Sequence, residues 1–321
     1  MSILSNKKIL DDMRSPRVKD VILDTDAANE MDDQFVIPYI IGCDKLNLLS
    51  VNAALFGWGS VTTEEGARRC YNEAVRVCRA IRGEGDTPID VYETSPVTMT
   101  STGGEAVDSP AVQNIIRTAM AAEDILYVLS IGACTNVASA IKLEPRIKDK
   151  ICVIWLGGNQ LHIGVTDMNE FNFIQDTEAG RFLLDSGVPL VLCPARNVTI
   201  VLGCDVEEFK RELTGGTPVM ELLLQLVNEF HSMANYEEGY SRTMWDIAAP
   251  ALLSIPDCAE YSIVPAPIIN EECHYSFDDS RHEIIMLDSL KRDMIFEDCW
   301  KCIKAVECTG EYIPRWTPEE K

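Results

Sequence analysis

Four aspartates lie within ten residues near the start of the chain, at positions 24, 26, 32 and 33. They follow the apolar run Val21-Ile22-Leu23 and precede residues 34–41, which have the pattern of a helix start. So much negative charge in one turn between a strand and a helix is unfavourable unless a positive group balances it. A hard cation with oxygen ligands is the simplest such group. The turn therefore predicts a metal-dependent hydrolytic site.

Short apolar runs alternate with helical patterns through the first two thirds of the chain, which predicts βαβ units. We expect buried strands at residues 21–23, 46–55, 125–131, 151–156 and 188–193, and helices at 64–82, 110–122, 136–143 and 177–186. In the last third we expect helices at 218–234, 246–253 and 293–303, and short strands at 261–265 and 283–287. The pattern predicts an α/β fold with an open, mostly parallel, doubly wound sheet and additional C-terminal helices. We expect one domain over residues 1–321.

Polar residues follow the expected strands at the points where each strand ends. Asp24 and Asp26 follow the first strand, residues 57–60 the second, residues 132–136 the third, and residues 157–159 the fourth, which leads on to residues 169–172. Ligands of open α/β sheets bind beyond the carboxyl ends of the strands. The sequence therefore predicts that these residues meet at one edge of the sheet.

The overall composition limits the classes of partner. The formal net charge of −23 argues against nucleic acid, because phosphate contacts need a basic face. No apolar stretch is long enough to span a bilayer, and residues 1–20 lack the apolar centre of a secretory signal. We therefore expect a cytoplasmic protein with a small-molecule substrate and no nucleic-acid or membrane partner.

The twelve cysteines are interpreted as reduced thiols. The one suggestive spacing is Cys299-Trp300-Lys301-Cys302, for which a zinc site would need a second pair. We interpret this pair as two thiols on a C-terminal helix, with metal or redox use as the open alternative.

Four segments carry a resemblance to the inosine-uridine-preferring nucleoside hydrolases, which cleave N-ribosidic bonds. They are the acidic turn from Asp24 to Asp33, residues 132–136 with 144–147, Gly157-Gly158 with residues 170–172 and 176–179, and Trp245-Asp246-Ile247-Ala248. Residues 291–296 are also similar to a family pattern. The order and spacing of the segments together make the match.

The resemblance implies a calcium ion at the floor of the site, and carboxylates with other oxygen ligands suit calcium. It places Asp26, Asp33, the main-chain carbonyl of Thr135 and the side chain of Asp246 around the ion. Asp26 is expected to be the general base that takes a proton from the attacking water. The transition state would have oxocarbenium character, which nearby negative charge stabilises. The resemblance also implies purine or pyrimidine salvage and a homodimer or homotetramer.

Asp32, Glu170 and Asn172 match family positions that bind the ribose hydroxyls, and Asp24 is expected to orient its neighbours from behind. Simpler explanations stay open for single residues. Asp32, Asp33, Thr135 or Asp246 alone could be a helix N-cap with a solvated face, and residues 170–172 could form an ordinary loop. Asp176 is predicted to be an N-cap.

The chain departs from the family pattern where the base would bind. The acidic turn is two residues longer, and Trp245 stands where many members have a histidine that protonates the leaving base. The asparagine after the second strand has no clear counterpart, and Gly164 replaces another asparagine. Candidates for the base side are His162, Trp245 and Trp58, with Tyr240 and Arg242 as further possibilities. A solvated His162 and a buried core Trp58 are the alternatives.

The sequence is therefore compatible with three functions. The leading one is calcium-dependent hydrolysis of a ribonucleoside to ribose and free base, with water activated by Asp26. The second is a calcium-bound ribose- or nucleoside-binding protein with little turnover. The third is hydrolysis of a different N-riboside, which could be polyanionic if Arg68, Arg196 or Arg242 lines the pocket.

Overall fold

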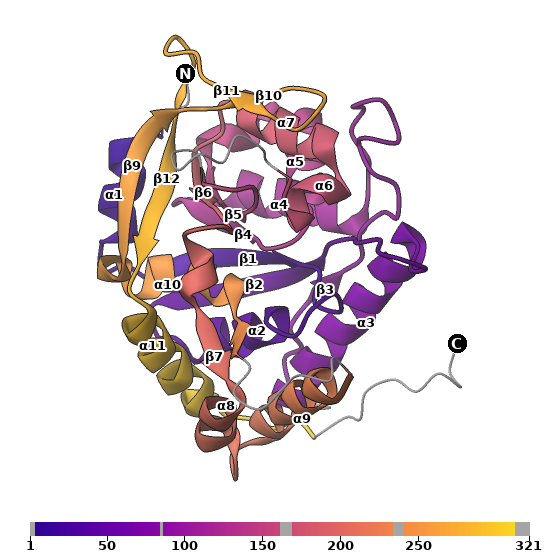
Figure 1. Cartoon of the computed structure of the whole chain (residues 1–321), viewed down its shortest axis with the longest axis vertical. Coiled ribbons are helices and arrows are strands. Elements are labelled where there is room, and N and C mark those ends of the chain that lie inside the picture. Colours follow the sequence, from indigo (N-terminus) through magenta and orange to yellow (C-terminus); the bar gives the residue numbers. More distant parts are fainter. Residues whose placement is uncertain (1–3, 84–85, 161–168, 234–240, 312–321) are drawn as a thin grey trace.

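The computed structural model describes residues 4–83, 86–160, 169–233 and 241–311, and an eight-stranded sheet forms its centre (Figure 1). The strand order is β3-β2-β1-β4-β5-β6-β12-β9. These strands are β1 Lys19–Thr25, β2 Leu46–Ala53, β3 Val91–Tyr92, β4 Leu126–Ser130, β5 Ile151–Leu156, β6 Leu190–Cys193, β9 Ala259–Pro265 and β12 Glu283–Leu290. All neighbours pair in parallel except β9, which is antiparallel to β12. The predicted open, mostly parallel sheet is confirmed.

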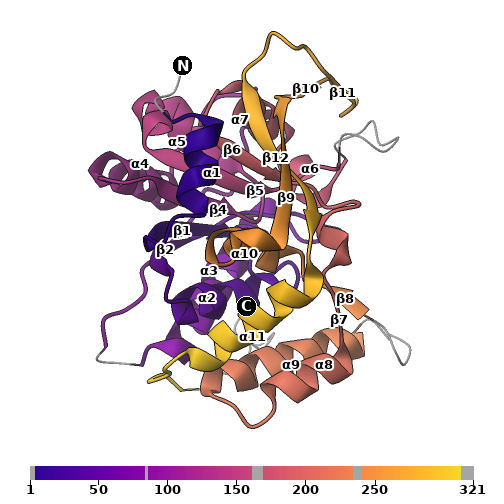
Figure 2. The same cartoon turned by 90° about the vertical axis from the view of Figure 1, so that its left-hand side faces the viewer.

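Helices cover both faces of the sheet (Figures 1 and 2). They are α1 Asn6–Met13, α2 Asp33–Gly42, α3 Thr63–Ile81, α4 Pro110–Ala121, α5 Thr135–Leu143, α6 Phe171–Gln175, α7 Thr177–Asp185, α8 Val206–Leu213, α9 Pro218–Met233, α10 Ala248–Ser254 and α11 Arg292–Ala305. Two smaller sheets pair β7 Gly203–Asp205 with β8 Ser241–Thr243 and β10 Ile268–Ile269 with β11 Tyr275–Ser276. None of the helices in the described part of the chain combines the length and apolar character needed to cross a bilayer.

Alternate residues of each strand belong to different hydrophobic cores, because successive side chains of a strand point to opposite faces. Val21 and Leu23 pack in the core that includes α2, α9 and α11, whereas Ile22 packs in the core that includes α4, α5 and α7. A strand that is buried on both faces has a continuous apolar sequence, as β1 does. This double burial fixes β1 in the centre of the sheet and its carboxyl end at the edge where Asp26 follows.

The ends of several helices follow from local capping. Asp176 is the N-cap of α7, as predicted, and its side chain accepts a hydrogen bond from the N–H of Ala179. The predicted helix over residues 246–253 is divided into a 3-10 turn, Trp245–Ile247, and α10. Cys299 and Cys302 lie buried on α11, the predicted C-terminal helix.

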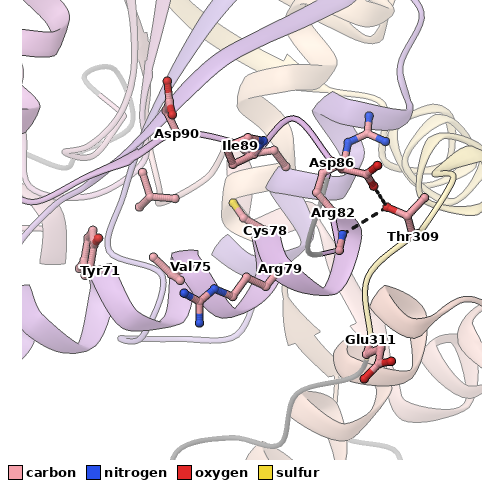
Figure 3. Close-up of a pocket in the computed structure, with 13 residues that line it drawn as sticks. Tyr71, Val75, Cys78, Arg79, Arg82, Asp86, Ile89, Asp90, Thr309 and Glu311 are labelled. Carbon is pink, nitrogen blue, oxygen red and sulfur yellow. Dashed lines mark hydrogen bonds between the residues drawn. The ribbon is translucent and has the colours of Figure 1, made fainter.

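A hollow of about 840 Å³ lies between α3 and residues 86–91 (Figure 3). Its charged side chains are Arg79, Arg82, Asp86, Asp90 and Glu311. The hydroxyl of Thr309, also in the lining, contacts Asp86 and accepts a hydrogen bond from the N–H of Gly83. The hollow contains none of the residues predicted to do chemistry. The predicted chemical residues lie instead at the carboxyl edge of the central strands.

Candidate active site

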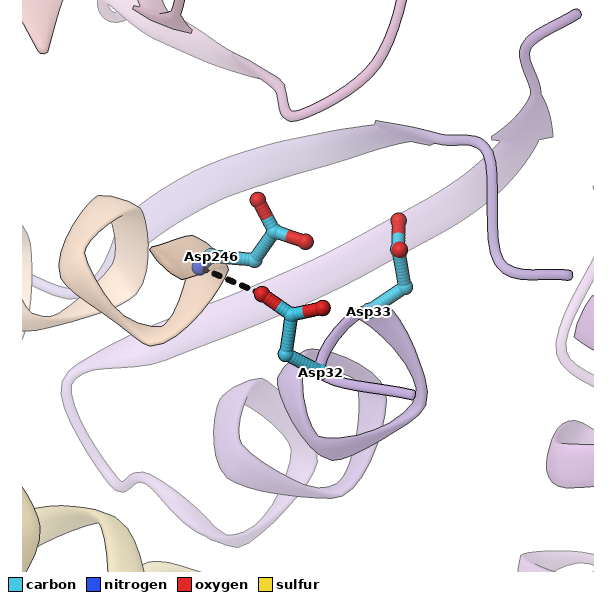
Figure 4. Close-up of side chains that lie close together, drawn as sticks. All are labelled: Asp32, Asp33 and Asp246. Carbon is cyan, nitrogen blue, oxygen red and sulfur yellow. Dashed lines mark hydrogen bonds between the residues drawn. The ribbon is translucent and has the colours of Figure 1, made fainter. Parts of the chain in front are cut away.

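Three aspartates form a cluster at the amino end of α2 (Figure 4). Oxygen atoms of Asp32, Asp33 and Asp246 lie within 4.8 Å of one another, and all three residues are buried. The main-chain N–H of Asp246, in the 3-10 turn, donates to Oδ2 of Asp32 at 3.3 Å. Asp32 is the N-cap residue of α2, but its side chain makes no capping hydrogen bond. Buried carboxylates that do not cap a helix are suited to hold a cation, so the cluster could bind a metal.

Asp26 adjoins this cluster from the end of β1. A Cβ atom on Gly132 would come within 2.8 Å of Oδ1 of Asp26, so the close approach of these two segments requires glycine. Oδ2 of Asp26 and Oδ1 of Asp246 are both buried, and neither accepts a hydrogen bond from a described residue. Burial of a polar atom without a partner costs free energy. These two oxygens therefore mark positions where a bound cation would be stabilising.

The electrostatics of the cluster are unfavourable without a positive charge. Burial raises the pKa of Asp33 to about 7, against a hydrogen bond from the Thr25 hydroxyl that lowers it. Burial also raises the pKa values of Asp26, Asp32 and Asp246 well above their usual range, and the charges of neighbouring carboxylates add to this. The groups must therefore either share protons or share a cation.

The longer acidic turn brings a fifth carboxylate and its counter-ion to the site. Glu30 forms an ion pair with Arg242 of β8. The guanidinium of Arg242 also lies over the ring of Phe230, 5.9 Å from the ring centre. This pair connects the turn to the strand that leads to Asp246. The pair could not be predicted from the sequence, because no local pattern indicates that residues 30 and 242 meet.

The side chains of Asp24 and Thr135 form hydrogen bonds with residues that do not belong to the three-aspartate cluster. The side-chain amide of Asn136 donates to Oδ2 of Asp24 at 2.9 Å, and burial raises the pKa of Asp24 to about 8. The hydroxyl of Thr135, the first residue of α5, donates to Oδ2 of Asp176 at 2.7 Å. The N-cap of α5 is Cys134, so the alternative that Thr135 is an N-cap is wrong. The alternative that Asp246 is an N-cap is also wrong, because Ile247 is the N-cap residue of α10. The carbonyl of Thr135 as a metal ligand stays a prediction.

A cavity of about 290 Å³ opens beside the cluster, close in size to the smaller ligand pockets of proteins. Its lining comes from the segments that follow β1, β4, β5 and β6 and from the 3-10 turn with Trp245 and Asp246. The predicted convergence at this edge is confirmed for Asp26, Asn159 and residues 169–172, whereas residues 57–60 and 132–136 do not line the cavity. The residues that line it are Asp26, Asn29, Glu30, Asp32, Asp33, Ile131, Leu156, Asn159, Asn169, Glu170, Phe171, Asn172, Ala195, Arg196, Trp245 and Asp246.

The two residues expected to bind ribose from α6 are fixed by main-chain contacts. Glu170 is the N-cap of α6, and its carboxylate accepts hydrogen bonds from the N–H groups of Gly158 and Asn172, each at 2.9 Å. Burial raises the pKa of Glu170 to about 7, although these hydrogen bonds lower it. The amide of Asn172 donates to the carbonyls of Ile131 and Leu156 at 3.0 and 2.9 Å. Both side chains are therefore held in place at the cavity wall.

The candidates for the base side differ in position. Trp245 lines the cavity. Trp58 is 65% exposed, so the alternative of a buried core tryptophan is wrong. Its ring packs on Phe171, which does line the cavity, with 5.7 Å between ring centres. His162, Gly164 and Tyr240 lie outside the described residues.

Comparison with known proteins agrees with the resemblance. The sequence profile of the family described as "Inosine-uridine preferring nucleoside hydrolase" matches residues 21–300. The pyrimidine-specific ribonucleoside hydrolase RihB of Escherichia coli O157:H7 is 33% identical over 145 residues, which is 45% of this chain and 44% of that protein. The match thus spans less than half the length of this curated relative.

Solved structures show the same fold. The plant nucleoside hydrolase PpNRh1 superposes with a TM-score of 0.70 at 16% identity, over 91% of this chain and 100% of that chain. A purine-preferring ribonucleoside hydrolase from Gardnerella vaginalis gives a TM-score of 0.67 at 21% identity, over 90% of this chain and 99% of that chain.

Proposed function

Because the chain belongs to the inosine-uridine preferring nucleoside hydrolase family, we propose that it hydrolyses the N-glycosidic bond of a ribonucleoside to ribose and free base. The observation that carries this proposal is the buried cluster of Asp32, Asp33 and Asp246 beside the cavity, with Asp26 adjoining it. The order of these residues along the chain is the one that the resemblance predicted. We further propose a cytoplasmic homodimer or homotetramer.

Calcium is the metal that best fits the donor set. All of the side chains concerned offer carboxylate oxygens, and calcium prefers six to eight oxygen ligands of this kind. We assign Asp26, Asp33, Asp246 and the carbonyl of Thr135 as its ligands. The buried oxygens of Asp26 and Asp246 that lack a partner among the described residues support this assignment. When bound, the ion supplies positive charge that balances the carboxylates and eases the loss of a proton from water.

In this proposal Asp26 is the general base. It accepts a proton from the water that attacks the anomeric carbon, and the neighbouring carboxylates that stay ionised stabilise the positive charge that develops on the sugar. Asp32, Glu170 and Asn172 bind the ribose hydroxyls. Glu170 can accept a further hydrogen bond, because each carboxylate oxygen has two lone pairs and the three main-chain donors, Gly158, Asn172 and Phe173, leave one of them at Oε1. Asp24 orients Asn136, the second residue of α5, through the hydrogen bond that it accepts from the Asn136 amide.

The base would lie against aromatic side chains. Trp245 lines the cavity and offers an apolar face for stacking, but its indole N–H is not an acid at neutral pH. Trp58 extends this aromatic surface outward through its contact with Phe171. His162 stays a candidate for protonation of the leaving base. The absence of an acid at position 245 favours the second function, a nucleoside-binding protein with little turnover.

The test is release of reducing sugar from a panel of purine and pyrimidine nucleosides, with calcium and with a chelator. The proposal expects release from at least one nucleoside, and loss of release in the chelator and in the Asp26→Asn variant. Asp279→Asn is the matched control, because Asp279 is an exposed aspartate outside the site. Tight ribose binding without release from any nucleoside would favour the binding protein and exclude the hydrolase.

A further inference from the structure

The cavity is acidic, yet one cation faces it. Six carboxylates are among the lining residues: Asp26, Glu30, Asp32, Asp33, Glu170 and Asp246. Arg196, on the segment that follows β6, is the one Lys or Arg side chain among the described residues that line the cavity. An arginine so placed either balances the carboxylates or serves a ligand.

The contacts of the two arginines near the site distinguish these roles. Arg242 balances the acidic turn, because it pairs with Glu30 and lies over Phe230. Arg196 is exposed and forms no ion pair or hydrogen bond with any residue in the described ranges. Arg68 is also exposed, but it does not line the cavity. Arg196 therefore keeps all five of its N–H donors available at the cavity wall.

The segment that carries Arg196 is held in place by its main chain. The N–H of Ala195 donates to the carbonyl of Gly158 at 3.0 Å, and that of Ile200 donates to the carbonyl of Ala195 at 3.1 Å. The residue after Arg196, Asn197, has a φ of 66°, in the left-handed region that asparagine adopts more readily than other residues with a side chain, so it can form the turn that follows Arg196. The fold thus presents Arg196 on an ordered turn rather than on a loose loop.

We propose that Arg196 binds an oxyanion group of the substrate, so that the substrate is an anionic riboside that carries a carboxylate or a phosphate. A planar guanidinium matches both groups with two parallel hydrogen bonds. The carboxylates of the cavity would otherwise repel an anionic ligand. The positive charge of Arg196 offsets this repulsion and attracts the anionic group. This inference depends on the proposed hydrolase activity and names the substrate class for the same site.

Two experiments test it. The first compares kcat/KM for uridine, for orotidine, which carries a carboxylate on the base, and for uridine 5′-monophosphate, which carries a phosphate on the sugar. We expect one anionic riboside to exceed uridine, and Arg196→Gln to lower its kcat/KM about 10- to 100-fold, mainly through KM. Uridine should change less than about twofold. Arg196→Lys should retain part of the preference, and Arg211→Gln, at an exposed arginine on α8, should change nothing.

The second experiment measures equilibrium binding of the same three compounds, which separates this inference from the hydrolase proposal. Absence of sugar release from all three and from the whole nucleoside panel, together with binding that depends on Arg196, would overturn the hydrolase and support the anion site. Equal effects of Arg196→Gln on neutral and anionic compounds, or no effect on either, would overturn the inference. A preference for orotidine would place the anion on the base, and a preference for the monophosphate would place it on the sugar.

Discussion

When divalent cations are removed, the free energy of unfolding is predicted to fall as the pH rises. Oxygens of Asp32, Asp33 and Asp246 lie within 4.8 Å of one another. At an effective dielectric constant of about 20, two unit charges at that separation repel by about 3 kcal/mol. Three ionised carboxylates form three such pairs, about 10 kcal/mol together, whereas the whole free energy of unfolding of a protein is typically about 5–15 kcal/mol. Without a cation, the folded chain must therefore keep protons in the cluster.

The direction of the pH dependence follows from the raised pKa values. Burial raises the pKa of Asp33 from 3.8 to about 7, so the folded chain holds a proton that the unfolded chain loses near pH 4. The folded state therefore binds more protons between about pH 4 and pH 7, and the free energy of unfolding falls as the pH rises through this window. For Asp33 alone this loss amounts to about 4 kcal/mol, or about 6 °C in Tm.

Thermal unfolding between pH 5 and pH 8 tests this reasoning, with excess chelator and with calcium. In chelator the Tm should fall with pH, and calcium should restore most of the loss because it replaces the protons. Asp246→Asn removes two of the three charged pairs, so it should flatten the pH dependence in chelator and weaken the response to calcium. Asp279→Asn should keep both. A Tm in chelator that does not fall with pH, or a full calcium response in Asp246→Asn, would show that the cluster neither holds protons nor binds the cation.

Three further changes have defined outcomes. Asp26→Asn should lower the rate of sugar release by about 10²- to 10⁴-fold, as expected when a general base is lost, without lowering the Tm measured in chelator. Asn172→Ala should destabilise the fold by about 2 kcal/mol in urea unfolding, because it leaves two buried carbonyls at the ends of β4 and β5 without their donor. Tyr39→Phe should cost about 1–2 kcal/mol in the same assay, because the Tyr39 hydroxyl donates to the Asp298 carboxylate at 2.7 Å, and glycosidase kinetics should stay unchanged.

The central sheet could be predicted because its strands are buried on both faces. Val21, Ile22 and Leu23 are all fully buried, so an apolar run identifies the strand without further information. The positions of β9 and β12 could not be predicted in the same way. Their sequences indicate strands, but only long-range packing places β12 beside β6 and reverses β9 against it.

Local signals explain some of the missed helices. α8 begins after Asp205, whose side chain accepts a hydrogen bond from the N–H of Glu208, and it buries Phe209 and Leu213. That pattern was present in the sequence and could have predicted the helix. By contrast, α6 has only five residues and depends on Glu170 as its cap, so its periodicity carries little information.

The candidate site could likewise be predicted only where local sequence patterns determine it. The aspartates of the acidic turn were identified from their spacing, because the carboxyl ends of parallel strands meet at one edge. The ion pair of Glu30 with Arg242 depends on two segments that are far apart in the sequence. Similarly, the availability of Arg196 could be recognised only once its surroundings were known.

The most direct test of the calcium site is a calcium titration of chelator-treated protein in which bound calcium and sugar release are measured together. We expect release from the preferred riboside to be absent without calcium and to rise in proportion to bound calcium, up to one ion per chain. Asp33→Asn and Asp246→Asn should lose binding and release together. Full sugar release from protein without bound metal, or calcium binding that both variants retain, would contradict a calcium-dependent mechanism.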